Sequence, residues 1–476
     1  VTIQPDSLRI LHNPLTGWVL YASMGVDAAD FWAQYDHMYI PELGHNVSVT
    51  DYAHTLYIRA SWTDFNPQED VYGWKIDSNL RAYIEGAYQR NMRLAFRVVV
   101  DSRDKRTEFT PQFVKDAGAK GFMNKGKWSP YSDDPVFQKY YTKFVKALAK
   151  DFNDPSKVEF IDGFGLGKWG EYHTMIYSTG DDTPKKAVFN WVTDIYSQAF
   201  DKVPVVINYH RWIGAGKDWV DDEHFAADSE EMLEEAIKKG YSLRHDAFGM
   251  TTYYGSWERR FAKKYRNICP IIMEGGWIVK SHNYWQDPRG YRKDSHEDVR
   301  RGEFDDSKEA HVNMMDFRFG DTKSWFKDAF DLVRRFLREG GYRLYPSEIS
   351  LPLEVSKKTT PTIKHCWNNL GWGYCPTNIP QWNQKYKVAF ALLDSETNEV
   401  RYTFVDTDTD LSKWIKGSPA EYVFEPDMSK VETGTYVWAV GLVDRSNKDL
   451  VGLDIAAKGD ILDSGWLKLS KVSIKK

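Results

Sequence analysis

The sequence predicts an α/β fold, a (β/α)8 barrel followed by an antiparallel β-sandwich, and three observations support it. Up to residue 345, short apolar runs bounded by turn residues alternate with amphipathic segments of helical period. Eight apolar runs can be counted, which is the number that a closed parallel barrel needs. Beyond Tyr345-Pro346 the helical segments stop and the pattern alternates with period two. We therefore expect two domains, a barrel at 1–345 and an immunoglobulin-like sandwich at 346–476.

The predicted barrel strands are apolar on both faces, as parallel strands covered by helices are. In order, these runs are 18–21, 54–62, 93–100, 158–167, 203–210, 246–254, 269–277 and 311–319. Apolar residues at helical spacing predict helices at 76–90, 135–152, 185–200, 229–239 and 324–339. Asp77 stands where its side chain can cap the first of these helices.

A doubly wound open sheet is the competing architecture for alternating strands and helices. That fold carries a glycine-rich phosphate-binding turn after its first strand. No such turn follows the run 18–21 in this sequence. The barrel is therefore favoured, and we expect no nucleotide cofactor.

The C-terminal region carries alternating runs at 387–393, 400–404 and 435–442, with turn residues between them. This pattern, without any segment of helical period, is typical of a sandwich. The acidic run 406–410 has the alternate carboxylates of a calcium loop. We favour a solvated hairpin loop there.

The composition is that of a globular protein with a large core. Of the 476 residues, 42% are apolar and 28% are charged. The formal net charge of -5 gives no electrostatic reason to expect a nucleic-acid partner, and no apolar run has the length of a membrane span. Aromatic residues reach 15%, with 19 Trp and 28 Tyr, an excess that fits stacking against the apolar faces of sugars.

The chain begins at Val1 rather than methionine, from which we expect a removed leader and a secreted or periplasmic location. Three cysteines are too few for a disulfide scaffold. Cys366 and Cys375 are close enough in sequence to pair in an oxidising compartment, and three free thiols are the alternative. Nothing in the sequence indicates an oligomeric state.

Two glutamates stand at the ends of predicted barrel strands. Glu171 follows the fourth run and Glu274 ends the seventh. Barrel enzymes keep their functional residues at the carboxyl ends of the strands, and strands three apart in a ring of eight can face one central cleft. Two carboxylates across a cleft are what cleavage of a glycosidic bond requires. The alternative for each glutamate is a structural role, as a helix cap or as the partner of an arginine.

The sequence around these residues resembles glycoside hydrolase clan A. The stretch 62–77 is similar to the segment after the second strand in family 42-like β-galactosidases. The stretches 13–18 and 169–173, together with the C-terminal module, also resemble an uncharacterised family of secreted bacterial proteins with a barrel and a sandwich. The resemblance covers nearly the whole chain.

This resemblance implies a retaining mechanism with Glu171 as general acid/base and Glu274 as nucleophile. Glu171 would then start protonated, with a raised pKa, and Glu274 would start ionised. The resemblance also implies that Arg59 keeps Glu274 ionised and that Tyr253 or Tyr254 donates a hydrogen bond to it.

One residue departs from the clan's pattern. Most members have an asparagine directly before the acid/base, where it binds the sugar 2-hydroxyl, and this sequence has Gly170. We expect His173, Asn208 or His210 to take over that contact, or else Glu171 is not the acid/base.

Four tryptophans stand at or just beyond predicted strand ends, where a substrate cleft would form. They are Trp62, Trp169, Trp212 and Trp277. Packing in the core is the alternative for each, and we favour stacking against sugar rings.

The sequence therefore predicts a glycoside hydrolase that cleaves β-glycosidic bonds. By resemblance, its substrate is a galactose-containing poly- or oligosaccharide such as the red-algal galactans carrageenan or agar. A non-catalytic carbohydrate-binding protein on a degenerate barrel is the main alternative, because Gly170 breaks the clan's motif. A metal-dependent hydrolase is a third, and we expect no metal because no His-x-His pair stands at a strand end.

Overall fold

The computed structural model describes residues 1–250, 253–276 and 296–476. Two compact units make up the chain: Trp18–Arg334 forms one, and Val1–Gly17 with Arg335–Lys476 forms the other. The predicted boundary between residues 345 and 346 falls inside strand β13 (Leu344–Ser350) of the second unit. Within the described ranges, no helix has both the length and the apolar character that a membrane crossing demands.

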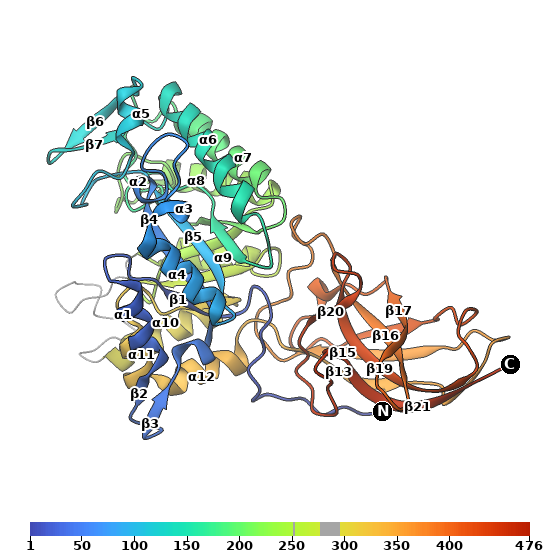
Figure 1. The fold of residues 1–476 in the computed structure, drawn as a ribbon. Coiled ribbons are helices and arrows are strands. Elements are labelled where there is room, and N and C mark those ends of the chain that lie inside the picture. The colour runs from blue at the N-terminus through green and yellow to red at the C-terminus, as the bar shows by residue number, and fades with distance from the viewer. Residues whose placement is uncertain (251–252, 277–295) are drawn as a thin grey trace. The chain divides into compact units, whose positions relative to one another are not determined.

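Eight parallel strands close into a barrel in the first unit, which confirms the predicted fold class (Figure 1). Each strand lies beside the next barrel strand of the chain, and the last lies beside the first. The strands are β1 (Gly17–Tyr21), β4 (Ala53–Ser61), β5 (Arg93–Val99), β8 (Val158–Asp162), β9 (Val205–Asn208), β10 (Ser242–Phe248), β11 (Ile271–Gly275) and β12 (Met314–Asp316).

The bounds of all eight strands differ from the prediction, and those of β8, β10 and β12 differ most. β8 ends at Asp162 and β12 spans only Met314–Asp316, so both are shorter than their apolar runs. β10 begins at Ser242, and the predicted run 246–254 contains only its last part. The reason is that Arg244 and His245 are buried inside this strand, whereas an apolar pattern excludes charged residues from a strand.

The helices of this unit lie around the barrel strands (Figure 1). The predicted helix 76–90 is α4 (Ser78–Gln89), and Asp77 caps it as expected by accepting a hydrogen bond from the Leu80 N–H. The predicted helix 324–339 is divided at Ala329 into two helices. The helices are α1 (Ala28–Asp36), α2 (Trp62–Phe65), α3 (Gly73–Ile76), α4, α5 (Gln112–Asp116), α6 (Pro135–Phe152), α7 (Lys185–Ala199), α8 (Glu223–Lys238), α9 (Ser256–Tyr265), α10 (His296–Glu309), α11 (Thr322–Asp328) and α12 (Phe330–Glu339). The division between the two units falls inside α12, after Arg334. Two hairpins, β2–β3 (Met38–Ile40, His45–Val47) and β6–β7 (Gly121–Asn124, Lys127–Pro130), complete the unit.

The second unit holds two largely antiparallel sheets. One contains β13, β15 (Ile363–Asn369) and β18 (Ala420–Phe424). The other contains β14 (Glu354–Ser356), β16 (Tyr386–Asp394), β17 (Val400–Asp406), β19 (Gly434–Asp444), β20 (Leu450–Leu453) and β21 (Leu467–Lys475). Phe390 of the larger sheet stacks on Phe424 of the smaller one. In the acidic run 406–410, Asp406 accepts a hydrogen bond from His365, 2.9 Å away.

All three cysteines of the chain, Cys269, Cys366 and Cys375, are free thiols.

Trp62 belongs to the packing around the barrel. It follows β4 directly, is completely buried, and its ring contacts Phe137, Tyr141 and Phe144 of α6. Its indole N–H donates to Asn66 at 3.1 Å. This tryptophan therefore anchors α6 and presents no face to a ligand.

Replacing this ring should destabilise the barrel. We expect Trp62→Ala to lower the free energy of unfolding by about 3–5 kcal/mol, the usual cost of emptying a core aromatic site. Chemical denaturation of Trp219→Ala, at a position 53% exposed, provides the control and should show a much smaller loss. Equal losses in the two variants would contradict the core role of Trp62.

Candidate active site

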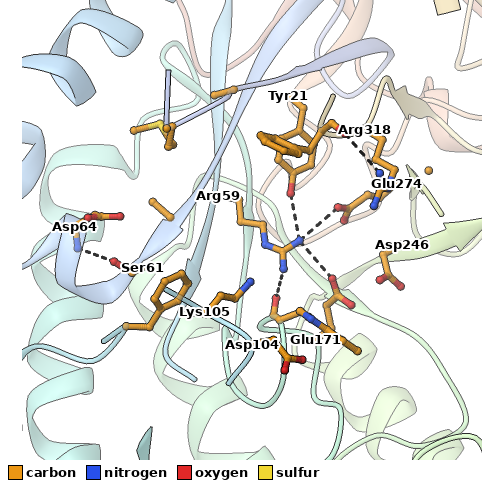
Figure 2. Close-up of a pocket in the computed structure, with 18 of the residues that line it drawn as sticks. Tyr21, Arg59, Ser61, Asp64, Asp104, Lys105, Glu171, Asp246, Glu274 and Arg318 are labelled. Atoms are coloured by element: carbon orange, nitrogen blue, oxygen red, sulfur yellow. Dashed lines mark hydrogen bonds and ion pairs between the residues drawn. The ribbon is translucent and has the colours of Figure 1, made fainter. Parts of the chain in front are cut away.

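A cavity of about 830 Å³ lies at the carboxyl ends of the barrel strands (Figure 2). It is bordered by the ends of β1, β4, β10 and β11 and by residues of the loops that follow β5, β8, β9 and β12. Its charged and aromatic lining residues are Tyr21, Arg59, Asp64, Asp104, Lys105, Phe109, Trp169, Glu171, Trp219, Asp246, Tyr253, Glu274, Arg318 and Phe319. Both predicted catalytic glutamates thus reach the same cavity.

Glu274 is the last charged residue of β11 and is held by guanidinium groups. Its carboxylate lies 2.8 Å from Nη2 of Arg97 and 3.2 Å from Nη2 of Arg244, and Arg59 Nη1 is 4.0 Å away. Burial by itself would raise the pKa of Glu274, but Arg97, Arg244 and Arg59 outweigh it and lower that pKa to about 2. Glu274 is therefore ionised at neutral pH.

Glu171 reaches the cavity from a tight loop after β8. The loop closes through a hydrogen bond from the Lys168 N–H to the His173 carbonyl, 2.8 Å long. Trp169 and Gly170 both have left-handed backbone, with φ of +62° and +73°. This turn directs the Glu171 carboxylate to Nη1 of Arg97, 2.6 Å away.

The ionisation of Glu171 differs from the expectation. Burial would raise its pKa, but a hydrogen bond from Asp246 and the charges of Arg97 and Arg59 lower it below the usual range. The expected raised pKa of Glu171 is therefore wrong, and the physical reason is its interaction with Asp246 together with the charges of Arg97 and Arg59.

Arg97 ties the two glutamates together. The same guanidinium that binds Glu171 and Glu274 also donates through Nε to Asp162 at 3.1 Å, and the side chain is completely buried. Arg59 lies between the same carboxylates, 3.7 Å from Glu171 and 4.0 Å from Glu274 (Figure 2). One nitrogen within 4.0 Å of both carboxylates places the two glutamates close together.

The sequence analysis missed Arg97, Arg244, Asp162 and Asp316, which all belong to this network. Arg97 shows the signal most clearly, because it is a charged residue between apolar neighbours, Phe96-Arg97-Val98. A charge in such a position can be buried only with a partner. That isolated charge was the available signal.

Gly170 explains the departure from the clan's asparagine. Its φ of +73° disfavours any residue with a side chain, and a Cβ would lie 3.2 Å from Val99 Cγ2 and 3.4 Å from Arg97 Cδ. A side chain at position 170 would therefore press against Arg97 and Val99. Glycine fits there, but it offers no group that could bind a sugar hydroxyl.

The histidines proposed to replace that asparagine form a buried stack. The rings of His173 and His210 lie 4.0 Å apart and nearly parallel. His210 Nε2 donates to the Glu171 carbonyl at 2.7 Å and Nδ1 accepts from the Trp212 N–H, so this ring is neutral. Burial and His173 accordingly lower the pKa of His210 to about 3. His210 thus positions the Glu171 backbone.

Asn208 and the two tyrosines also stand away from the predicted contacts. Asn208 is buried at the end of β9, and neither polar atom of its side chain has a hydrogen-bond partner among the described residues. In place of a bond to Glu274, the Tyr253 hydroxyl bonds to His173 Nε2 and the Tyr254 hydroxyl lies 2.8 Å from that of Tyr209. Of these residues, only Tyr253 lines the cavity.

The tryptophans predicted to stack against sugar rings lie in different environments. Trp169 lines the cavity, and so does Trp219, which the sequence analysis did not select. Trp212 is buried behind Tyr253, with the two rings 16° from parallel. Trp62 is in the core, and Trp277 lies outside the described residues.

One group of possible metal ligands occurs within the described ranges, at Glu171, His173 and Asp246, with ligand atoms within 4.8 Å of one another. Both His173 nitrogens are already engaged, by Tyr253 and by Asp218 at 3.0 Å. Arg97 and Arg59 would also repel a cation beside Glu171. The group is therefore better suited to holding protons than to holding a metal.

No protein-family model matches the sequence, and no curated protein matches it. Among solved structures, the chain is similar to endo-glycoceramidase II from Rhodococcus sp. (TM-score 0.42, 13% identity, 90% of this chain and 99% of that chain covered). It is also similar to a GH30 endoxylanase from Clostridium papyrosolvens C71 (0.41, 8%, 88% and 96%) and to xylanase B from Clostridium stercorarium F9 (0.37, 13%, 64% and 85%). None of these three is named as a family 42 enzyme. At such scores the matches assign neither a substrate nor residue roles.

The low pKa of Glu274 should make stability depend on pH. Because this pKa is about 2 in the folded protein and 4.5 is its ordinary value, the ionised group stabilises the fold above pH 4.5, and that contribution disappears as the pH falls toward 2. The contribution is roughly 3 kcal/mol. In urea denaturation across this pH range, Glu274→Gln should lack this component, and Glu85→Gln, at an exposed position on α4, should retain it. An unchanged pH dependence in Glu274→Gln would contradict the assigned ion pairs.

Proposed function

We propose that the protein is a retaining glycoside hydrolase that cleaves β-glycosidic bonds. One observation carries this proposal: Glu171 and Glu274 reach one cavity from different barrel strands and share the Arg97 guanidinium. Two carboxylates about 5 Å apart suit direct attack on the anomeric carbon, whereas a wider gap leaves room for water. Arg59 Nη1 lies 3.7 Å from Glu171 and 4.0 Å from Glu274, so both carboxylates face one part of the cavity, and the retaining mechanism itself is what the resemblance to clan A implies.

In this mechanism Glu274 is the nucleophile. Its ionised oxygen attacks the anomeric carbon while the acid on the Glu171 side protonates the leaving oxygen. Water then attacks the glycosyl-enzyme bond, gives its proton back to the acid, and releases Glu274. Arg97 and Arg244 keep Glu274 ionised before attack and receive it again as a carboxylate afterwards.

We infer that the substrate is a galactose-containing poly- or oligosaccharide. The resemblance to family 42-like β-galactosidases supports this sugar, and the cavity-lining rings of Trp169 and Trp219 offer faces for stacking. A polysaccharide is met outside the cytoplasm, so the expectation of a secreted or periplasmic protein is part of this proposal.

Charge discriminates between the two candidate galactans, sulfated carrageenan and neutral agarose. Lys105 is half-buried, lines the cavity, and has no ion-pair partner among the described residues. Burial and the neighbouring Arg59 lower the pKa of Lys105 to about 8, so a bound anion would stabilise its charged form. We therefore favour the sulfated galactan.

A carbohydrate-binding protein without hydrolysis is the second candidate. The observation in its favour is that Arg97 and Arg59 keep Glu171 ionised, whereas an acid catalyst must carry a proton. This candidate predicts oligosaccharide binding with no product on any substrate.

Removing the nucleophile tests the proposed reaction. Glu274→Gln should reduce turnover of aryl β-glycosides and galactan oligosaccharides by roughly 10⁴-fold or more, while oligosaccharide binding persists. The matched control is Glu234→Gln on α8, where the glutamate pairs with Lys264 on the outside of the barrel. NMR of the first-formed product should show the β-anomer. Near-normal turnover by Glu274→Gln, or an inverted product, would rule out the mechanism.

The preference for a sulfated substrate is tested by binding alone. In a Glu274→Gln background, calorimetry should show tighter binding of carrageenan than of agarose oligosaccharides. Adding Lys105→Gln should weaken the carrageenan complex about tenfold, because a charged hydrogen bond in a half-buried site is lost. Lys186→Gln, at an exposed site on α7, removes the same charge elsewhere. If Lys105→Gln and Lys186→Gln bind carrageenan equally well, Lys105 does not bind a sulfate group of the substrate.

A further inference from the structure

Asp246 is an acidic residue of the cavity for which the predicted mechanism has no role. It stands near the end of β10, lines the cavity, and its side chain is 19% exposed there. A carboxyl oxygen of Asp246 lies within 4.8 Å of one of Glu171. Two carboxyl groups this close in a buried site do not both ionise, because the second negative charge is repelled by the first. The pair therefore holds a proton.

The ion pairs decide which member of the pair holds it. Arg97 contacts Glu171, Glu274 and Asp162 with its three nitrogens. Arg244 contacts Glu274 and Asp316. Neither arginine contacts Asp246, which has no guanidinium or ammonium partner among the described residues.

His245, the histidine that precedes Asp246 in β10, does not supply a cation either. His245 Nδ1 lies 3.7 Å from Asp246 but accepts a hydrogen bond from the Ala247 N–H, so it carries no proton. Burial lowers the pKa of His245 well below its usual range. His210, a further ring of the cluster, is neutral as well, because Nε2 donates to the Glu171 carbonyl and Nδ1 accepts from the Trp212 N–H.

The pKa shifts of the two carboxyl groups also place the proton on Asp246. Burial raises the pKa of Asp246 well above its usual range, and the negative charges of Glu171 and Glu274 raise it further, against the opposing effect of Arg97. Glu171 shifts in the opposite direction. Two neighbouring carboxyl groups with opposite shifts divide into one acid and one carboxylate.

We propose that Asp246 holds the proton that Glu171 delivers to the leaving oxygen, which makes Asp246 a positioning residue for the acid/base step. This inference rests on the proposed function for its role in catalysis, but the shared proton exists without any substrate. It also removes the conflict between an ionised Glu171 and its proposed role as an acid.

The step balances in protons. As Glu274 attacks and the glycosidic bond breaks, the leaving oxygen takes a proton from Glu171 and Glu171 takes the proton of Asp246. The pair is then doubly negative, and Arg97 and Arg59 offset its charge. In the second half, the attacking water returns one proton to the pair, which regains its starting state.

Infrared spectroscopy tests the shared proton without substrate. At neutral pH the protein should show the C=O stretching band of a protonated carboxylic acid, and part of it should be missing in Asp246→Asn. Asp36→Asn should keep the full band, because Asp36 is ionised beside Arg90 at 2.6 Å. Asp246→Ser serves as the second variant if the amide does not fold. A band identical in wild type and both Asp246 variants would overturn the proposal.

The pH profile tests the catalytic role. In wild type, kcat/KM should hold to high pH and fall only when Asp246 loses its proton. In Asp246→Asn, Glu171 must hold the proton alone beside two arginines, so the alkaline limb should move to lower pH by about one unit or more. The loss should be largest for substrates with poor leaving groups, which need the acid most. An unchanged alkaline limb would overturn the role of Asp246, whereas absence of hydrolysis in wild type would sink only the proposed function and leave the infrared result standing.

Discussion

The site depends on one buried guanidinium. Arg97 comes from the third barrel strand and binds one carboxylate from the fourth strand, one from the loop after it and one from the seventh. A buried arginine is tolerated only when its donors are paired. The positions of Glu171 and Glu274 therefore follow from where the fork of Arg97 points, and the pKa values of both carboxylates follow from its charge.

That arrangement separates the acids of the cavity by their partners. Glu274 has three guanidinium neighbours and is a stable carboxylate. Asp246 has no guanidinium neighbour among the described residues and keeps its proton. Glu171 is a carboxylate that can take this proton from Asp246. The neutral ring of His210 and the hydroxyl of Tyr253 add hydrogen-bonded walls beside these carboxyl groups. Chemistry with one permanent anion and one mobile proton is what such a division of roles allows.

The sequence allowed the barrel to be predicted because strand and helix periods differ along most of the chain. The sequence also allowed Glu171 and Glu274 to be predicted at the same end of the barrel, because the carboxyl ends of parallel strands lie together at one end. Arg97 and Asp246 lay inside predicted strands, but a local pattern does not name the partner of a buried charge, and the ion pairs of Arg97 and Arg244 join residues far apart in the sequence. The prediction that Trp62 lines the cleft was wrong for another reason. Trp62 is buried by its contacts with α6, and the residues next to Trp62 in the sequence do not indicate that contact.

The same ion pairs bear on how the barrel assembles. Arg97 and Arg244 sit on the third and sixth strands, while their partners are spread from the fourth strand to Asp316 on the eighth. In a barrel without its last two strands, Arg244 would lose Glu274 and Asp316, and Arg97 would lose Glu274. Each charge left buried without its partner costs several kcal/mol. Incomplete rings are thereby disfavoured. Cooperative closure of this barrel is thus secured by the charges at its centre as well as by its apolar shell.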